Sequence, residues 1–408
     1  MSTTTARSVF ASRAFSLFFA GQALSYVGDG LRTIAIPLLV YHLTNSASAL
    51  GVTYALEFLP FAVFGLVGGS LADRIDRRKL MIACDAIRFS IMVLFAIGYA
   101  TGFLTLGGLY AGIAVMALAA AIFMGGQASS IPYMLGKDRA TQAVSALIAT
   151  EQASVLVTPP LGGALFALAG PLPALLINAF TYLCSQASLA LVDDLGPAQP
   201  AGAPTLREIC ADIATGFRFL WRDAAMLQLT VLGCVFNFFG LMTAAVFIPF
   251  LKRDLGASDV AVGYALGIGA IGALAGSVIA GRLPRKWPLG RILWIAYALD
   301  GVLFIPVVFA RNLPTAVVFL ALTNACVTFE IAQIVGWRMR IIPEELVGRV
   351  FGAVRLVALI GTVPGSIAGG LLADHFGARV PIAISGVGYL VTALAVFPAM
   401  LALRRERR

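Results

Sequence analysis

Long apolar runs fill most of this 408-residue chain, and they constrain its fold more than any other feature. Charged residues make up only 12% of the sequence, about half the fraction found in a soluble domain. Apolar runs of about 20 residues without alternation predict membrane-spanning helices, because a helix satisfies its own backbone hydrogen bonds where water is absent. The expected fold class is therefore an all-α membrane protein with about twelve transmembrane helices.

The expected spans fall into two groups of six, separated by a polar stretch near the middle of the chain. We expect them at Phe15–Val40, Ala49–Leu71, Leu80–Tyr99, Leu109–Met134, Val144–Ala167, Leu172–Val192, Met226–Leu251, Ala261–Ile279, Arg291–Phe309, Thr315–Ile341, Val350–Leu372 and Val380–Leu401.

Basic residues are distributed unevenly between the two sets of loops. With an even number of spans both termini lie on one side, which then carries 22 Lys and Arg residues against four on the other. Because Lys and Arg are retained in cytoplasmic loops, both termini are predicted to be cytoplasmic. The basic residues are scattered over six loops and tails, so the net charge of +9 does not predict nucleic-acid binding.

Three short patterns recur in order at similar offsets. The stretch from Ala72 matches the stretch from Ala280 (280 − 72 = 208), Gly162 matches Gly369 (369 − 162 = 207), and Ile131 matches Ile342 (342 − 131 = 211). This repeat predicts two parallel six-helix halves, 1–193 and 224–408, with a substrate site at their interface. The connecting segment 194–223 begins as a flexible linker and continues, from Thr205, as an amphipathic helix on the membrane surface.

A charged loop between the second and third expected spans carries the most specific pattern. Its five key residues are Gly69, Asp73, Arg74, Arg77 and Arg78. The loop resembles the one between helices 2 and 3 of the major facilitator superfamily, a large group of secondary transporters, although its positions 75 and 76 depart from that pattern. The resemblance implies a latch on the cytoplasmic side, and a role limited to setting topology is the alternative.

A second motif bears on the direction of transport. Pro159, Gly162 and Gly163 resemble the Gly-Pro-x-x-Gly-Gly signature of exporting antiporters in that superfamily, with Thr158 in place of the first glycine. Prolines and glycines also allow a kinked, tightly packed helix, so a packing role stays open. The SYVGDG and IIPEELVGRVFG segments further resemble the branch that contains enterobactin-type and macrolide-type exporters.

Ionisable residues inside a span cost at least about 2.5 kcal/mol at the bilayer centre, so each needs a reason. The candidates for proton coupling are Asp29, Glu57, Glu151 and Glu330. Asp29 shares a helix face with Gln22, Ser25 and Arg32, which would look into the cavity. The alternative for Asp29 is a static pair with Arg32, and for Glu57 and Glu151 it is packing.

The second half offers two further groups of cavity candidates. Glu330 shares one helix face with Thr323, Gln333 and Trp337. Phe236, Asn237 and Phe238 suit a large, partly apolar ligand, with helix packing as the alternative. Asp300 is interpreted as mainly structural, because the resemblance places the third helix of each triplet outside the cavity. Arg88 is expected to snorkel, or to pair with Asp85 or the charged loop.

Together with the resemblance, these features predict proton-coupled efflux of a small amphipathic compound, drug-like or siderophore-like, across a bacterial inner membrane. The transporter is expected to be a monomer. Besides the substrate, its expected partners are protons and membrane lipids. An importer, a facilitator or a lipid flippase are alternatives on the same fold, followed by a membrane sensor or a membrane-embedded enzyme. The sequence contains no phosphate-binding loop and only two histidines, so no cofactor, metal site or enzymatic activity is expected.

Overall fold

The structure is a computed structural model that describes the chain except residues 1–8, 193–194, 197–205, 283–287, 344–345 and 403–408. Side chains are also left undescribed at 61–74, 137–138, 206–210, 212–213, 348, 396 and 398–402. The described residues form helices and no strand, which confirms the predicted all-α fold class.

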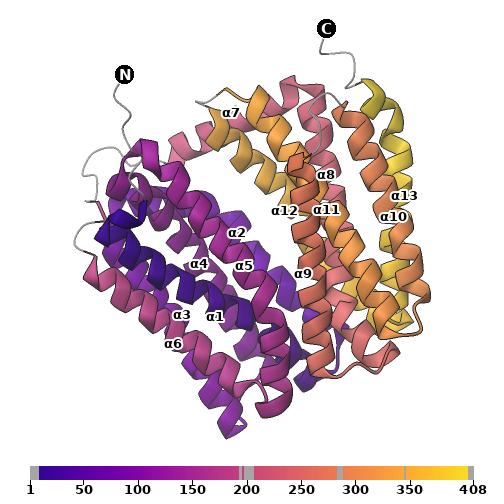
Figure 1. The fold of residues 1–408 in the computed structure, drawn as a ribbon, viewed down its shortest axis with the longest axis horizontal. Coiled ribbons are helices and arrows are strands. Elements are labelled where there is room, and N and C mark those ends of the chain that lie inside the picture. Colours follow the sequence, from indigo (N-terminus) through magenta and orange to yellow (C-terminus); the bar gives the residue numbers. More distant parts are fainter. Residues whose placement is uncertain (1–8, 193–194, 197–205, 283–287, 344–345, 403–408) are drawn as a thin grey trace. The chain divides into compact units, whose positions relative to one another are not determined.

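The helices follow the expected spans closely, with one additional helix between the two groups of six (Figure 1). They are α1 (Arg13–Thr44), α2 (Ala47–Arg74), α3 (Arg77–Thr101), α4 (Leu106–Leu135), α5 (Lys137–Ala169), α6 (Leu172–Leu191), α7 (Leu206–Arg222), α8 (Ala224–Pro249), α9 (Asp259–Arg282), α10 (Leu289–Phe309), α11 (Leu313–Ile341), α12 (Val347–Phe376) and α13 (Arg379–Ala402), with short η1 (Val9–Ala11) before α1 and η2 (Phe250–Asp254) after α8.

The helices group into two compact units. The N-terminal unit comprises Met1–Ile36 and Pro60–Thr205, and the C-terminal unit comprises Pro37–Leu59 and Leu206–Arg408. The unit boundaries in the first two helices fall at Pro37 of α1 and Pro60 of α2, where proline removes a backbone donor and weakens the helix. The tip of the α1–α2 hairpin therefore groups with the helices from the second half of the sequence.

The same packing order recurs in both units. In the N-terminal unit α3 packs against α4 and α6, and α5 packs against α6. In the C-terminal unit α10 packs against α11 and α13, and α12 packs against α13. Helix α10 thus corresponds to α3 and α13 to α6, which agrees with the repeat predicted from the sequence offsets.

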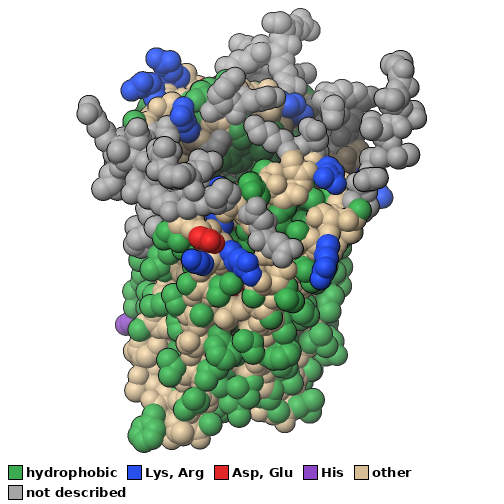
Figure 2. All heavy atoms as spheres, turned by 90° about the vertical axis from the view of Figure 1, so that its left-hand side faces the viewer, with side chains coloured by type: hydrophobic (Ala, Val, Ile, Leu, Met, Phe, Trp, Pro, Cys, Tyr) green, Lys and Arg blue, Asp and Glu red, His purple; other side chains and the backbone are tan. Residues whose placement is uncertain are grey.

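The outer surfaces of the helices are apolar. Ten described helices are long and apolar enough to cross a membrane, and a shorter apolar stretch lies at 379–395. Leu94 of α3, Phe180 of α6 and Leu394 of α13 are each more than 60% exposed. Figure 2 shows one face on which hydrophobic side chains cover the surface while Lys and Arg gather towards one end. Such a surface requires lipid around it.

Helix α7 differs from the spanning helices. It has 17 residues, and its apolar Leu220 is buried in the core of the C-terminal unit while Arg218 and Arg222 are exposed. The helix packs against α8 and α12. The connecting segment thus contains a helix that groups with the C-terminal unit.

Two glycines of α12 position α8, which carries several of the cavity candidates. A Cβ at Gly361 would lie 2.0 Å from the carbonyl oxygen of Cys234, and a Cβ at Gly365 would lie 2.1 Å from that of Phe238. Only glycine permits this approach, so the two helices are in backbone contact along this face.

Candidate functional site

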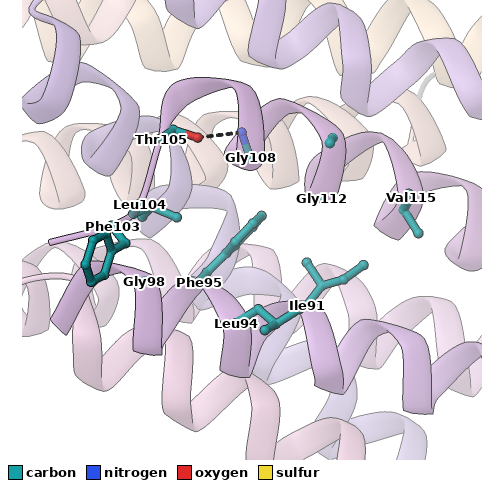
Figure 3. A pocket seen from close by; sticks show the side chains of 11 residues that line it. Ile91, Leu94, Phe95, Gly98, Phe103, Leu104, Thr105, Gly108, Gly112 and Val115 are labelled. Carbon is teal, nitrogen blue, oxygen red and sulfur yellow. Dashed lines mark hydrogen bonds between the residues drawn. The ribbon is translucent and has the colours of Figure 1, made fainter. Parts of the chain in front are cut away.

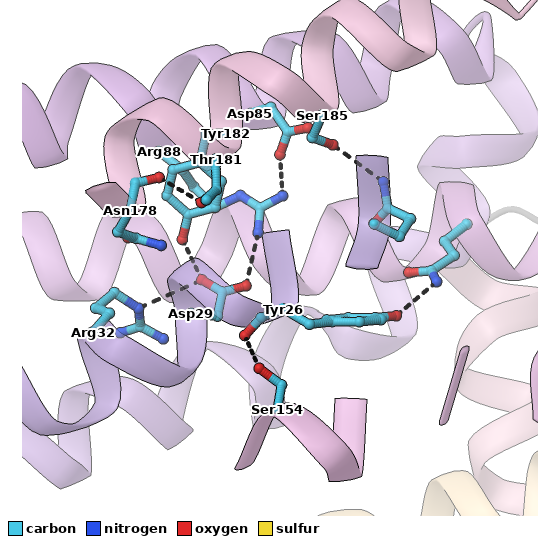
Figure 4. A network of polar contacts seen from close by, with 12 residues as sticks. Tyr26, Asp29, Arg32, Asp85, Arg88, Ser154, Asn178, Thr181, Tyr182 and Ser185 are labelled. Atoms are coloured by element: carbon cyan, nitrogen blue, oxygen red, sulfur yellow. Dashed lines mark hydrogen bonds and ion pairs between the residues drawn. The ribbon is translucent and has the colours of Figure 1, made fainter. Parts of the chain in front are cut away.

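The most extensive polar network of the N-terminal unit surrounds Asp29 on α1 (Figure 4). The hydroxyl of Tyr182 on α6 donates a hydrogen bond to Asp29 Oδ1. Arg32 Nε lies 3.7 Å from Asp29 Oδ1, and Arg88 Nη1 of α3 lies 3.9 Å from Asp29 Oδ2. The pair with Arg32 that the spacing predicted is present, and Asp29 also interacts with two further helices.

Arg88 occupies the centre of this network. Its guanidinium pairs with Asp85, which is fully buried one turn earlier on α3. The guanidinium also lies 4.7 Å from the ring centroid of Phe123 and 4.6 Å from that of Tyr182. Cation–π contacts and a carboxylate partner compensate the burial of the charge. The expected pairing of Arg88 with Asp85 is thus confirmed.

The charges of this network balance. Two aspartates, Asp29 and Asp85, face two arginines, Arg32 and Arg88. Of the neighbouring polar groups, Gln22 Nε2 donates to Ser185 Oγ at 3.1 Å and Ser25 is buried on the same helix, whereas the side-chain amide of Asn178 has no hydrogen-bond partner among the described residues. With every charge paired, the arrangement resembles a structural ion-pair network as much as an exchangeable proton site.

The motif on α5 packs directly against α1. Ser154 Oγ donates to the carbonyl oxygen of Tyr26 at 2.7 Å, and a Cβ at Gly30 would lie 2.1 Å from Thr158 Oγ1. Gly162 faces Leu31, and Pro159 is buried beside it, with Gly163 next in the chain. Glu151 is exposed at the other end of this stripe, within electrostatic range of Asp29. The close approach of α5 and α1 therefore depends on Gly30 of α1 facing Thr158, while Gly162 makes ordinary van der Waals contact with α1.

The charged loop is described only in part. The side chains of Gly69, Asp73 and Arg74 lie outside the described residues. Arg77 is buried, and its Nη1 donates to the carbonyl oxygen of Leu195 at 3.5 Å. Arg78 donates to the carbonyl oxygen of Ala190. These bonds fix the start of α3 to the end of α6.

The C-terminal unit contains the most isolated acidic side chains of the described structure. Glu330 on α11 is 3% exposed, and its Oε1 has no hydrogen-bond partner among the described residues. Asp300 on α10 is fully buried, and neither of its carboxylate oxygens has such a partner. Glu330 lies within electrostatic range of Asp300. The sequence pointed to Glu330, but it did not place Asp300 beside it.

The other candidates on α8 and α11 are engaged in packing. Trp337 is buried in the core of the C-terminal unit with Leu229 and Tyr297, and Gln333 Nε2 donates to the carbonyl oxygen of Ala280 on α9 at 3.0 Å. Thr323 is buried and donates to the carbonyl oxygen one turn earlier.

On α8 the amide of Asn237 donates to the carbonyl oxygen of Gly233 within its own helix. Phe236 stacks on Tyr389 with ring centroids 4.6 Å apart, and Phe238 contacts Phe239 edge-on. Phe236, Asn237 and Phe238 are all half-buried, so each keeps some surface available for a ligand.

Glu57 belongs to the C-terminal unit through the tip of the α1–α2 hairpin, whereas Asp29 belongs to the N-terminal unit. Glu57 is half-buried and lies within electrostatic range of Tyr54, one turn earlier on α2.

The same hairpin tip carries a contact that the sequence did not predict. Asp374, near the end of α12, accepts hydrogen bonds from the backbone N–H groups of Ala47 and Ser48, each at 2.8 Å, and from Ser46 Oγ at 2.6 Å. A carboxylate at a helix N-terminus satisfies free donors and favours the helix dipole. Asp374 therefore fixes the start of α2 to α12. In the sequence, the only sign of this contact is the pair Ser46 and Ser48 at the start of α2.

A hollow of about 400 Å³ lies between the ends of α3 and α4 (Figure 3). Its lining is apolar, with Phe95, Leu104 and Val115 among the side chains, and its one hydroxyl, on Thr105, caps α4. The hollow contains no charged group and none of the candidate residues, so it suits an acyl chain better than a polar substrate. Among the described residues no cluster of three or more His, Cys, Asp or Glu could hold a metal ion.

Comparison with known proteins identifies the sequence family that the fold suggests. The family model of the Major Facilitator Superfamily matches residues 18–337 and 230–408. The multidrug efflux pump Tap of Mycobacterium tuberculosis is 26% identical over 385 residues, covering 89% of this chain and 88% of the relative. The enterobactin exporter EntS of Escherichia coli is 25% identical over 425 residues, covering 97% and 94%.

Solved structures share the fold at lower identity. A bacterial homologue of the lysosomal transporter Spinster superposes with a TM-score of 0.78 at 16% identity, covering 98% of this chain and 99% of that one. A bacterial homologue of the iron transporter ferroportin gives a TM-score of 0.74 at 16% identity, with 97% and 99% coverage.

Proposed function

Because this chain belongs to the Major Facilitator Superfamily, we propose that it is a proton-coupled exporter of a small amphipathic compound. The family and the efflux relatives make the chain a multi-pass membrane transporter of small molecules and not an enzyme. The proposal adds the direction, the coupling ion and the class of substrate.

The names of the relatives support export. One relative is a multidrug efflux pump and another exports enterobactin, and both align over most of their length. The cargo we propose is a drug-like or siderophore-like molecule with apolar and polar parts, for which Asn237 and Phe238 supply the amide and the aromatic surface. Import, facilitated passage or lipid flipping on the same fold are the competing functions.

The observation that carries proton coupling is the burial of Glu330 without a compensating cation among the residues that the structure describes. An ionised carboxylate in such a place is costly, whereas a protonated one is not. Asp29, by contrast, is held by Arg32 and Arg88. We therefore rank Glu330 first among the proton carriers, ahead of Asp29, Glu57 and Glu151.

The proposed cycle alternates access to the two sides of a bacterial inner membrane, with a monomer whose termini are both cytoplasmic. On the cytoplasmic side, Asp73 and its neighbouring arginines act as the latch. Replacement of Asp73 by Asn removes charge at constant size, so we expect normal insertion with greatly reduced transport. If the Asp73→Asn variant transports like the wild type at equal expression, the charged loop only sets the orientation of the helices in the membrane.

The deciding experiment measures efflux in vesicles across a panel of amphipathic compounds, with the proton gradient imposed or collapsed. Export that requires the gradient supports the proposal. Equal flux with and without the gradient would favour a facilitator, and dependence on a sodium gradient would favour a different coupling ion. A reporter fused after Arg408 tests orientation, since activity in a periplasmic format would contradict it.

A further inference from the structure

We infer that Asp300 and Glu330 form one proton-binding carboxyl pair, in which Asp300 is a direct proton ligand and not only a packing residue. The inference rests on the proposed proton coupling for its role in transport, whereas the pair itself is argued from burial, missing hydrogen-bond partners and the packing of its two helices. Helices α10 and α11, which carry the two residues, pack against each other in the C-terminal unit.

Shared neighbours place the two carboxyl groups at one location. Cys326, one turn before Glu330 on α11, lies within electrostatic range of both Asp300 and Glu330. Tyr297, one turn before Asp300 on α10, does so as well, and Tyr389 of α13 is the third such neighbour. Three side chains on three helices therefore surround the same pair of acids.

The pair is dry. Asp300 is fully buried and Glu330 is 3% exposed. Both oxygens of Asp300 and Oε1 of Glu330 lack a hydrogen-bond partner among the described residues. Around them, Phe236 lies between Tyr297 and Tyr389, with ring centroids 4.1 Å and 4.6 Å away. Aromatic walls of this kind exclude water and cannot neutralise a carboxylate.

The buried cation on the same helix as Glu330 is engaged elsewhere. Arg338, about two turns beyond Glu330 on α11, is buried and donates from Nη2 to Thr230 Oγ1 of α8 at 3.0 Å. It lies within electrostatic range of Tyr297, but it is not among the groups that act on Glu330 or Asp300. Among the described residues, the charged or titratable groups that face the pair are therefore Tyr297, Cys326 and Tyr389, none of them a cation.

Two carboxyl groups that are buried away from water, and that have no cation beside them among the described residues, need another source of positive charge. Two carboxyl groups supply four oxygens, fewer than the six to eight that a hard cation such as Ca²⁺ takes. A proton needs only one or two oxygens, and a second carboxylate in the same dry region disfavours ionisation of both groups at once. The pair therefore holds at least one proton in this conformation and releases it when the site opens to water.

The test is infrared spectroscopy of the purified full-length protein, with acid–alkaline difference spectra recorded in the carboxylic-acid region. We expect the wild type to show a protonated-carboxyl band that is lost or shifted in both Glu330→Gln and Asp300→Asn. Asp254→Asn is the matched control, because Asp254 is paired with Arg379 at 3.0 Å and should not affect the band. If Asp300→Asn does not fold, the Asp300→Glu variant must shift the band instead.

The outcomes separate the pair from the transport mechanism. A band unchanged in all Asp300 and Glu330 variants overturns the pair, even if efflux proves to be proton-driven. A band that disappears on addition of sodium at constant pH also overturns it, because the site would then hold a metal cation. The infrared band could be altered by the Asp300 and Glu330 substitutions while efflux proves independent of the proton gradient. That result would support the pair and overturn the proposed function.

Discussion

The two units place opposite charges at corresponding positions. Arg88 of α3 and Asp300 of α10 occupy corresponding helices at an offset of 212 (300 − 88), close to the offsets of the sequence repeat. Tyr182 of α6 and Tyr389 of α13 are related by 207 (389 − 182), and each faces the charged residue of its own unit.

The difference lies in the compensation of charge. The N-terminal unit surrounds its arginine with two aspartates and a second arginine, so that the network is neutral. The C-terminal unit surrounds its aspartate with a second acid and aromatic rings, and the described residues supply no cation to the pair. The N-terminal repeat thus holds a fixed ion-pair network, and the C-terminal repeat holds a site that requires a proton. We infer that the first stabilises the fold and the second couples transport to protons.

The sharpest test of this comparison is neutralisation of Glu330. A proton carrier must bind and release a proton in each cycle, so Glu330→Gln should reduce gradient-driven efflux to background while sparing exchange down a concentration gradient. Efflux in vesicles with the gradient imposed or collapsed is the measurement, with Asp254→Asn as the control. Full uphill transport in Glu330→Gln, Asp29→Asn and Glu57→Gln alike would refute proton antiport.

The next largest effect is expected from breaking the N-terminal network. Arg88→Gln leaves the fully buried Asp85 without its cation, and removing one partner of a buried pair costs about 3 to 5 kcal/mol. We expect a corresponding loss of thermal stability in detergent, and substantial recovery in the Arg88→Gln, Asp85→Asn double variant. If the double variant is no more stable than the single one, the pair does not account for the loss.

Sequence alone predicted much of the fold, because the length and spacing of apolar runs fix where helices cross a membrane. It also indicated the helix within the connecting segment. It could not place Asp300 beside Glu330, since the two residues lie on different helices and their proximity depends on how α10 and α11 pack. The Asp374 cap on α2 was missed for the same reason: it joins residues more than 300 positions apart.

The two corresponding tyrosines give a smaller, matched comparison. Tyr182 donates to the charged Asp29, and loss of a hydrogen bond to a charged group costs about 1.5 to 3 kcal/mol. Tyr389 donates to the neutral carbonyl of Phe236 at 3.3 Å, a bond worth about 0.5 to 1.5 kcal/mol. Thermal unfolding should therefore show a larger loss of stability for Tyr182→Phe than for Tyr389→Phe. Equal losses would contradict the difference in charge environment.

The smallest effect is expected at Arg32, which defines the edge of the N-terminal network. Its Nε is 3.7 Å from Asp29, and both side chains retain some exposure, 17% and 29%. Solvent screens such a pair, so Arg32→Gln should cost less than about 1 kcal/mol of stability. Asp29 would still be held by Tyr182 and Arg88, and its charge would still be compensated. We expect thermal unfolding close to wild type and gradient-driven efflux retained. A loss as large as that of Arg88→Gln would contradict this ranking and show that Arg32 contributes to the charge balance of this unit as much as Arg88 does.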